Sequence, residues 1–488
     1  MAAKKPSKTK PVKGWDKHQR PFVHGKYDDE SVISQSTRDE CAPGTYEYRF
    51  DGKAKRKACL LRDTAGVRAK LETLGTEMAT KAPSSVSSAI PAGYTYLGQF
   101  IDHDITLDAL SDLHGQNDPA TTTNFRTPRL DLDSVYGQGP GIDPFLYEQA
   151  SGGKRLLLGT NTPVGPGGPP TVTTPTDFDL PRNGEAGQHT ALIGDMRNDE
   201  NLIVSQLHHG FLKFHNAVLA AVGDDFERAR RSVTHHYQWI VMHDFLPRIC
   251  DPVVANGWTA RIEKRKKPLQ RSFRMPVEFS VAAYRFGHSM VRENYDVNQN
   301  FPNATMGEVF AFASPPQLPV FSNWVVDFNR FFGPSATNLA SAIDTRLALQ
   351  LDHLPGMPPG ILEKLAARNL LRGLSFDLPS GQCVADSLKI ARLSRAELLQ
   401  GATANEAAVL QADSDELLKK TPLWYYVLKE SEVRASGQHL GKVGSKLVAA
   451  ALATMLAVDE NSYLYASPKF TPTHATDMIS LFGFAGVT

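Results

Sequence analysis

One histidine between two carboxylates is the first feature of this chain that could do chemistry. In the segment Gly98-Gln-Phe-Ile-Asp-His-Asp104, His103 stands between Asp102 and Asp104. Apolar residues at positions 97, 101 and 105 recur at the spacing of one helix face, which predicts a helix over residues 94–107. Consecutive helical residues point about 100° apart, so the three polar groups cannot serve one ligand from one side. Either a catalytic base lies between cofactor-binding and metal-binding groups, or a core histidine lies between two surface carboxylates.

A second polar segment is Thr127-Pro-Arg-Leu-Asp-Leu-Asp-Ser-Val-Tyr-Gly137. We expect it to be extended, so that Thr127, Arg129, Asp131 and Asp133 alternate along the chain and share one side. Two carboxylates, a hydroxyl and nearby carbonyls suit a hard cation. The alternative is a surface strand of alternating polarity.

Residues 194–216 predict a helix in which cations and carboxylates meet near the start. Asn198 is a suitable cap, and Arg197 and Glu200 are three residues apart, where both can reach one ligand. His208 and His215 lie two turns apart, and we interpret them as buried structural histidines rather than a metal pair.

Residues 281–292 predict another helix, with Arg285 and His288 on one face. Ala282, Ala283 and Gly287 lie nearby. Small residues let something flat and wide approach the backbone, although for this stretch alone close helix packing is the favoured interpretation.

The composition limits the possible partners. The chain has 488 residues, with 53 Lys+Arg against 52 Asp+Glu, so no overall field attracts nucleic acid or anionic lipid. No apolar run approaches the length of a membrane span. No apolar stretch marks a secretory signal near the start, so we expect a cytoplasmic protein or one exported by a route without a signal peptide. Residues 1–25 are basic and polar, and we expect a solvated tail.

The periodicity elsewhere predicts a mainly α protein, with one large domain over residues 26–488, long loops and few short strands. Helical patterns occur at 65–78, 226–247, 338–351, 359–371, 395–410 and 441–458. The four cysteines, Cys41, Cys59, Cys250 and Cys383, show no zinc spacing. A Cys41–Cys59 bridge is possible, but we expect free thiols in a reducing compartment.

Together, these residues could supply the groups that cleavage of a peroxide requires. A base must move a proton from one peroxide oxygen to the other, and a cation must stabilise the charge that develops. An iron must take the remaining oxygen while a histidine holds that iron from the opposite side. His103, Arg197 and His288 could supply the base, the cation and the iron ligand.

The chain resembles the animal-type haem peroxidases of the peroxidase–cyclooxygenase superfamily. Three segments carry the resemblance: residues 98–104, residues 194–200 running on to His208 and His215-Asn216, and Ala283-Tyr-Arg-Phe-Gly-His288. Residues 127–137 and Phe245-Leu-Pro247 add to it, and the order matches the family from about residue 90 to 380. The resemblance implies one helical haem peroxidase domain. It also implies that hydrogen peroxide is reduced through a high-valent iron–oxo intermediate, with halide, thiocyanate or small aromatic donors oxidised.

The resemblance also implies roles for individual residues. His103 matches the distal histidine and Arg197 the distal arginine, while Gln99 matches a glutamine that lines the distal cavity. His288 matches the proximal iron ligand. On this basis two imidazoles lie on opposite sides of one haem.

On the proximal side, Asn369 falls where the family has an asparagine bonded to the ligand's second nitrogen, a contact that fixes the ring. Arg285 and Arg372 would face the haem propionates, since guanidinium groups suit carboxylates.

The resemblance further implies covalent links and a metal ion. Asp102 and Glu200 match carboxylates that form ester bonds to methyl groups of a haem b-derived cofactor. Asn201 stands where one branch has a methionine linked to the haem, so that third link is not expected.

The implied Ca²⁺ ligands are Asp104, Thr127, Arg129 through its carbonyl, Asp131 and Asp133. Position 133 is often serine in the family, so the site in this chain would be more anionic.

Two other functions are open. Fatty-acid dioxygenases of the same superfamily carry a radical-forming tyrosine three residues before the proximal histidine, where this chain has Arg285. Tyr284 is adjacent, and we expect it on another helix face. A haem-free helical binding protein is the other alternative, against which the set His103, Arg197, His288 and Asn369 argues.

Overall fold

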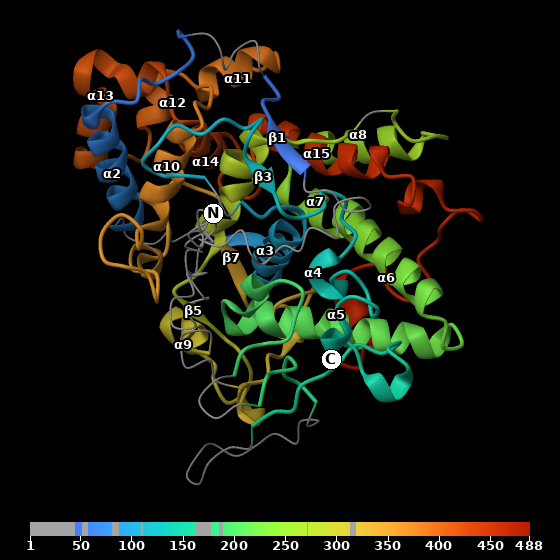
Figure 1. Cartoon of the computed structure of the whole chain (residues 1–488). Helices are drawn as coiled ribbons and strands as arrows, with labels where there is room; N and C mark the ends of the chain where they lie inside the picture. The colour runs from blue at the N-terminus through green and yellow to red at the C-terminus, as the bar shows by residue number, and fades with distance from the viewer. Residues whose placement is uncertain are drawn as a thin grey trace, which may run out of the picture.

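The computed structural model describes residues 44–50, 57–80, 87–108, 111–162, 177–184, 189–270, 272–312 and 319–488. The expected tail over residues 1–25 lies outside them. Helices dominate, and the strands among the described residues form only small sheets (Figure 1). The mainly α fold predicted from the sequence is confirmed.

Helix α3 (Gly93–Ile105) lies near the centre of the molecule (Figure 1). Its Leu97, Phe100 and Ile101 are fully buried, as are His103 and Asp104. The helix packs against α5 (Leu202–Ala221), the 3₁₀ helix η8 (Ala283–Met290) and the short α4 (Asp133–Tyr136). The predicted helix over residues 94–107 is confirmed to within two residues, and it is buried on nearly all sides because partners cover several faces.

Helix α5 (Leu202–Ala221) begins later than the sequence pattern suggested. Asn201 caps it by accepting the Val204 N–H, and a 3₁₀ turn, η5 (Met196–Asp199), precedes it. The predicted Asn198 cap is therefore wrong. The Asn198 side chain bonds two histidines instead, because η5 brings it back towards α3.

The segment predicted as one helix over residues 281–292 has two other helical forms. A π-helical turn, η7 (Glu278–Ala282), leads into a 3₁₀ helix, η8 (Ala283–Met290). Residues i and i+3 eclipse in a 3₁₀ helix. Arg285 and His288 therefore share a face, as predicted, although the helix type was not.

The strands that the structure describes are β1 (Gly44–Glu47), β2 (Ser87–Pro91), β3 (Thr123–Asn124), β4 (Met275–Pro276), β5 (Asn294–Tyr295), β6 (Ala304–Thr305) and β7 (Leu339–Ser341), and they form sheets of order β3-β1-β4, β2-β7 and β5-β6. The remaining α- and π-helices are α2 (Ala65–Thr80), α6 (Phe226–Ile240), the π-helical η6 (Val241–Phe245), α7 (Leu246–Ile249), α8 (Pro252–Glu263), α9 (Met306–Ala311), α10 (Leu365–Ser375), α11 (Gly381–Ser387), α12 (Arg395–Leu399), α13 (Ala404–Lys419), α14 (Leu423–Arg434), α15 (Lys442–Val458) and α16 (Met478–Phe484). Short 3₁₀ helices are η3 (Pro144–Leu146), η4 (Gln149–Ser151), η9 (Ser322–Trp324), η10 (Phe328–Arg330), η11 (Leu349–Asp352) and η12 (Tyr463–Tyr465). The predicted helix over 338–351 is wrong, because β7 pairs with the distant β2. Long-range pairing overrides the local pattern there.

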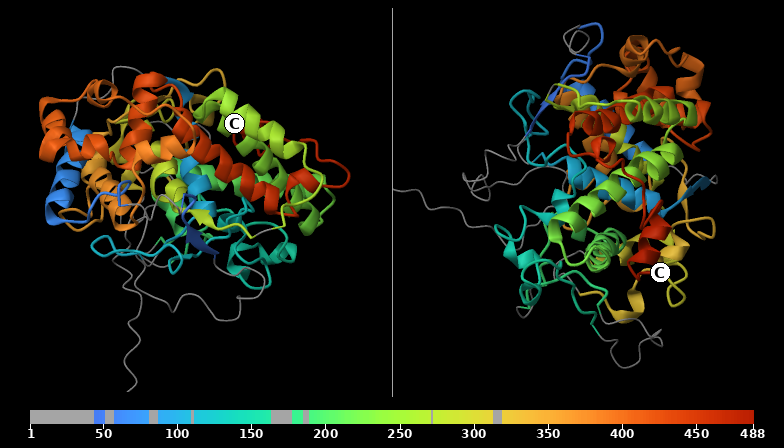
Figure 2. Two further views of the ribbon diagram at one scale, coloured as in Figure 1. Left: turned by 90° about the horizontal axis from the view of Figure 1, so that it is seen from above. Right: turned by 90° about the vertical axis from the view of Figure 1, so that its right-hand side faces the viewer.

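Helix α10 is positioned by α2, a helix almost 300 positions earlier in the sequence. The two lie side by side in Figures 1 and 2. Gly75 of α2 meets the backbone of Ala367, where a Cβ atom would lie 2.5 Å from the Ala367 Cα. This close approach fixes the position of α10 relative to α2, and hence the position of the polar residues that follow Ala367.

A disulfide joins Cys59 and Cys383. The expectation of free thiols is therefore wrong for this pair, whose sequence separation of 324 residues gave no local clue. Cys250 is a buried free thiol, as expected. Cys41, and with it the possible Cys41–Cys59 bridge, lies outside the described residues, although Cys59 already has its partner. Across the described part of the chain, no helix combines the length and apolar character needed to cross a bilayer.

Candidate functional site

A cavity of about 1010 Å³ lies between α3, η8 and α10. Cofactor pockets are mostly apolar, with a few placed polar groups. The polar groups of this cavity include Gln99 and Asp102 of α3 and Glu200, which precedes α5. They also include Arg285 and His288 of η8, and Arg368 of α10. Segments distant in sequence thus meet at one cavity, although the predicted base His103 and the predicted cation Arg197 do not line it.

The fully buried His103 is held by a hydrogen-bonded chain. Its Nδ1 lies 2.8 Å from the Asn198 Oδ1, and the Asn198 Nδ2 lies 2.9 Å from Nδ1 of His208. An amide oxygen only accepts hydrogen bonds, so Nδ1 of His103 carries the proton and Nε2 carries the lone pair. Burial, followed by the charge of Arg197, lowers the pKa of His103 to about 3. His103 is therefore a neutral base of defined tautomer.

Glu200 contacts both His103 and the cavity. Its Oε2 lies 3.9 Å from the His103 Nε2 and accepts a hydrogen bond from the Gln99 Nε2 at 3.0 Å. The Gln99 Oε1 in turn accepts from Asn201. Burial raises the pKa of Glu200 to about 8, so this carboxyl group is protonated at neutral pH.

Arg197 does not line this cavity. Its Nε and Nη2 bind the two oxygens of Asp195 at 3.0 and 2.7 Å, and Nη2 also donates to the carbonyls of His103 and Thr106. It therefore lies at the carboxyl end of α3, where a cation is favoured. Arg126 and Arg197 hold the pKa of Asp195 well below its usual range, although burial alone would raise it. Arg197 and Glu200, expected to reach one ligand, are thus directed to different places.

A smaller cavity of about 340 Å³ adjoins this arginine. Arg197, Arg285 and Arg372 all line it. Arg372 forms an ion pair with Asp108 and lies over the Phe376 ring. Three guanidinium groups around one small space suit carboxylate groups.

The second histidine, His288, also has an asparagine at Nδ1. The Asn369 Nδ2 lies 2.8 Å from it, while the Asn369 Oδ1 accepts from the Arg285 Nη1 at 3.1 Å. An amide N–H only donates, so Nδ1 of His288 accepts and Nε2 carries the proton. Burial, followed by the charge of Arg285, lowers the pKa of His288 to about 3.

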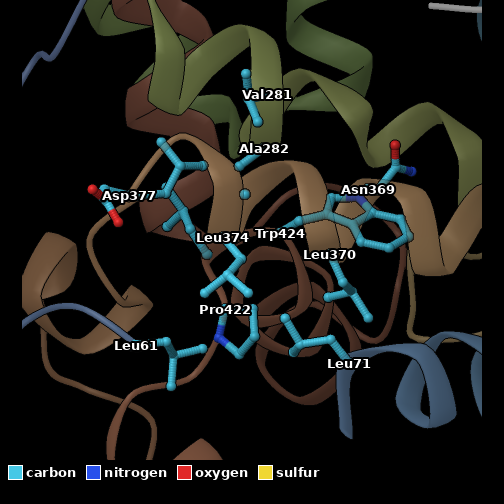
Figure 3. A pocket seen from close by; sticks show the side chains of 13 residues that line it. Leu61, Leu71, Val281, Ala282, Asn369, Leu370, Leu374, Asp377, Pro422 and Trp424 are labelled. Carbon is cyan, nitrogen blue, oxygen red and sulfur yellow. The ribbon is translucent and has the colours of Figure 1, made fainter. Parts of the chain in front are cut away.

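Asn369 is backed by a separate apolar cavity of about 390 Å³ (Figure 3). Leu71, Leu370 and Trp424 line it, and Asp377 lies at the end opposite Asn369 (Figure 3). The Trp424 indole donates to the Arg285 carbonyl. Since the side chains around Asn369 on this side are apolar, Arg285 and His288 decide how its amide is turned.

The acidic cluster forms, but not on an extended segment. Oxygens of Asp104, Asp131 and Asp133 lie within 4.8 Å of one another. Leu130 (φ 57°) and Leu132 (φ 59°) adopt the left-handed conformation, which L-residues rarely adopt. The predicted strand is therefore wrong, because these two turns fold the segment so that its carboxylates face α3.

Other expected members of this cluster lie nearby. The Thr127 Oγ1 donates to the Asp131 Oδ1 at 2.7 Å. Arg129 lies in the same turn with its side chain exposed. Burial raises the pKa of Asp133 to about 7. An oxygen-rich cluster that retains carboxylates in a buried turn is chemically suited to a hard cation.

Arg126 was missed by sequence reasoning. It contacts the Asp133 Oδ1 at 3.3 Å and the Asp195 Oδ2 at 2.7 Å, so it ties the acidic cluster to the turn that carries Arg197. Gly194 completes this junction, because a Cβ there would lie 2.6 Å from the Ser134 carbonyl oxygen. Asp195 was also missed, and Asn198 was predicted as a helix cap rather than as the partner of His103 and His208.

Residues 108–419 match the family model described as animal haem peroxidase. This chain belongs to the animal haem peroxidase family. The matched range contains Arg197, His288 and Asn369 and begins just after His103.

Known relatives agree with this membership. The chain is 26% identical to thyroid peroxidase of Mus musculus over 211 residues, which is 39% of this chain and 23% of the relative. It is 32% identical to a peroxidase-like protein of Margaritifera margaritifera over 115 residues, 21% of this chain and 14% of that protein. It therefore spans under a quarter of the length of these relatives.

Solved structures share the fold. Peroxidase A of Dictyostelium discoideum superimposes with a TM-score of 0.54 at 16% identity, covering 80% of this chain and 83% of that one. The fatty acid alpha-dioxygenase of Oryza sativa gives a TM-score of 0.61 at 14% identity, covering 96% and 84%. Peroxidases and dioxygenases thus both have this architecture.

Family membership implies haem, and the residues fit it. An imidazole, His288, lines the large cavity together with the carboxyl groups of Asp102 and Glu200. Arginines line the adjoining smaller cavity. An imidazole can ligate haem iron, and guanidinium groups suit its two propionates.

Proposed function

We propose that this protein is a haem peroxidase that reduces hydrogen peroxide and oxidises halide, thiocyanate or small aromatic donors. The observation that carries this proposal is the His103–Asn198 hydrogen bond, which leaves the lone pair of a neutral imidazole at Nε2, towards Glu200. Haem, when bound, supplies the redox-active iron.

The residues of the chain then have separate tasks. His103 takes a proton from one peroxide oxygen and returns it to the other. Arg197, held by Asp195 at the end of α3, adds positive charge behind the base. His288 is the proposed iron ligand, with Asn369 fixing its ring.

We further propose that Asp102 and Glu200 form ester bonds to the haem. Both line the large cavity, and burial raises the pKa of each. The variant Asp102→Val with Glu200→Gln should release haem to acid–organic extraction, whereas the parent should retain it. Equal extraction from both proteins would remove this part of the proposal.

We also propose that the acidic cluster binds Ca²⁺ through Asp104, Thr127, the Arg129 carbonyl, Asp131 and Asp133. Convergence of three carboxylates in a strained turn supports it. Elemental analysis of the purified protein should find about one calcium per chain. Asp131→Asn should lower that content, and an unchanged content would count against the site.

The test of the main function uses the purified protein as expressed. A Soret absorbance band should be present without added haem, and peroxide-dependent oxidation should be measurable with bromide, thiocyanate or phenols. Absence of both the Soret band and the turnover would support a haem-free binding protein instead.

A fatty-acid dioxygenase is the second candidate, and Tyr284 favours it. The sequence placed this side chain on another face, but it lines the large cavity, because the change from π to 3₁₀ winding turns it inward. Its buried hydroxyl has no hydrogen-bond partner in the described part of the chain. Oxygen uptake with linoleate and no added peroxide, abolished by Tyr284→Phe, would support this activity over the peroxidase.

A further inference from the structure

Arg368 is a buried cation on the large cavity. It is 7% exposed and precedes Asn369 on α10. Its Nη1 donates to the Leu362 carbonyl at 3.1 Å and lies 3.9 Å from the Met357 sulfur. Among the residues that the structure describes, no carboxylate forms an ion pair with it.

The other arginines nearby differ from it. Arg372 is paired with Asp108, and Arg285 donates to Asn369. Burying a charge without a counter-ion is costly. Burial, followed by repulsion from Arg372, lowers the pKa of Arg368 to about 10, so the group still carries its charge at neutral pH. An anion entering the cavity would relieve this cost.

The haem propionates are not the best source of that anion. Both propionates leave one edge of the macrocycle, so they need a single place with several cations. The smaller cavity offers one, lined by Arg197, Arg285 and Arg372, and Arg368 does not line it. Apolar residues that line the large cavity with Arg368 include Leu351, Leu354 and Leu365. Glu200 also lines it and raises the pKa of Arg368, although this effect is smaller than that of burial.

We propose that Arg368 binds the carboxylate of an organic substrate whose aromatic or aliphatic body packs on these leucines. This inference rests on the proposed function, since it assigns a substrate class to the same cavity. A guanidinium group binds a carboxylate through paired hydrogen bonds, whereas leucines exclude water and strengthen that contact. Carboxylated donors should thus be preferred to neutral donors of equal size.

The test compares 4-hydroxyphenylacetate with 4-methylphenol, which lacks the carboxylate. In the holoenzyme, Arg368→Gln should raise KM for 4-hydroxyphenylacetate about tenfold or more and change KM for 4-methylphenol by less than about twofold. The kcat values should stay near the parent values. Arg395→Gln, which removes an exposed arginine paired with Asp415, is the matched control and should change neither KM.

A binding measurement separates this inference from the proposed function. Calorimetric titration with decanoate should show binding to the parent and a tenfold or greater loss in Arg368→Gln, whether or not the protein turns over peroxide (about 1.4 kcal/mol per tenfold change). Equal binding by both proteins would overturn the assignment.

Haem content and haem affinity show whether Arg368 binds a haem propionate instead of a substrate. If Arg368→Gln lowers haem content, and the parent's preference for iron protoporphyrin over its dimethyl ester disappears, Arg368 serves a propionate and the substrate assignment is wrong. Unchanged haem content supports it.

Discussion

Each side of the large cavity has a histidine whose Nδ1 is hydrogen-bonded to an asparagine, but the direction of the hydrogen bond is opposite on the two sides. On the α3 side, Asn198 presents its oxygen to Nδ1 of His103; on the η8 side, Asn369 presents its nitrogen to Nδ1 of His288. The first arrangement places the ring lone pair at Nε2, and the second places the proton there.

The difference shows which side is ready for its proposed task. His103 already has the tautomer of a base. His288 can bind iron through Nε2 only if Nδ1 holds the proton, which requires Asn369 to present Oδ1. That oxygen accepts from Arg285, so we expect iron binding to draw Arg285 away from the amide and towards a carboxylate of the cofactor.

The largest effect should come from His288→Ala. Loss of the iron ligand should abolish the Soret band or leave weakly held, inactive haem, because the arginines alone bind only the edge of the cofactor. Absorbance of the purified variant measures this. A parental spectrum and haem content would exclude His288 as the ligand.

The next effect concerns the orientation of the Asn369 amide. Asn369→Ala should weaken haem binding about 10- to 100-fold, as found for residues that orient metal ligands. Asn369→Asp should bind haem at least as well as the parent, because a carboxylate accepts from Arg285 and from the His288 Nδ1–H at once. Haem titration of protein expressed without haem measures both. Equal loss in the two variants would show that the amide orientation is irrelevant.

A smaller effect is expected at Asn198. Asn198→Ala should slow the reaction with hydrogen peroxide roughly tenfold while haem content is kept, since one hydrogen bond that fixes the tautomer is lost. Asn198→Asp should restore most of the rate. Asn298→Ala removes a buried asparagine that bonds backbone carbonyls elsewhere and is the matched control. A control as slow as Asn198→Ala would indicate a general loss of stability.

The smallest effect is the pH dependence of the parent. For a histidine of unperturbed pKa, the neutral fraction would fall roughly thirtyfold between high pH and pH 5. Because the pKa of His103 is lowered to about 3, its neutral form persists, and the rate with peroxide should be nearly constant between pH 7 and pH 5. Stopped-flow rates that fall across this range would show that the imidazole titrates normally.

Local patterns predicted more of the α3 side than of the η8 side. The helix over 93–105 follows from apolar spacing. The π and 3₁₀ winding of residues 278–290, which brings Tyr284 to the cavity, does not, because it depends on packing against α10 and α14. The ion pair of Arg126 with Asp195 also escaped prediction, since it joins residues 69 positions apart that only the fold brings together.

The most direct test of the account is the rate of the haem-loaded protein with hydrogen peroxide in His103→Ala. We expect a parental Soret band and a rate constant lower by about 100- to 10,000-fold, because the positioned base is gone. A variant that keeps its haem and reacts as fast as the parent would contradict it.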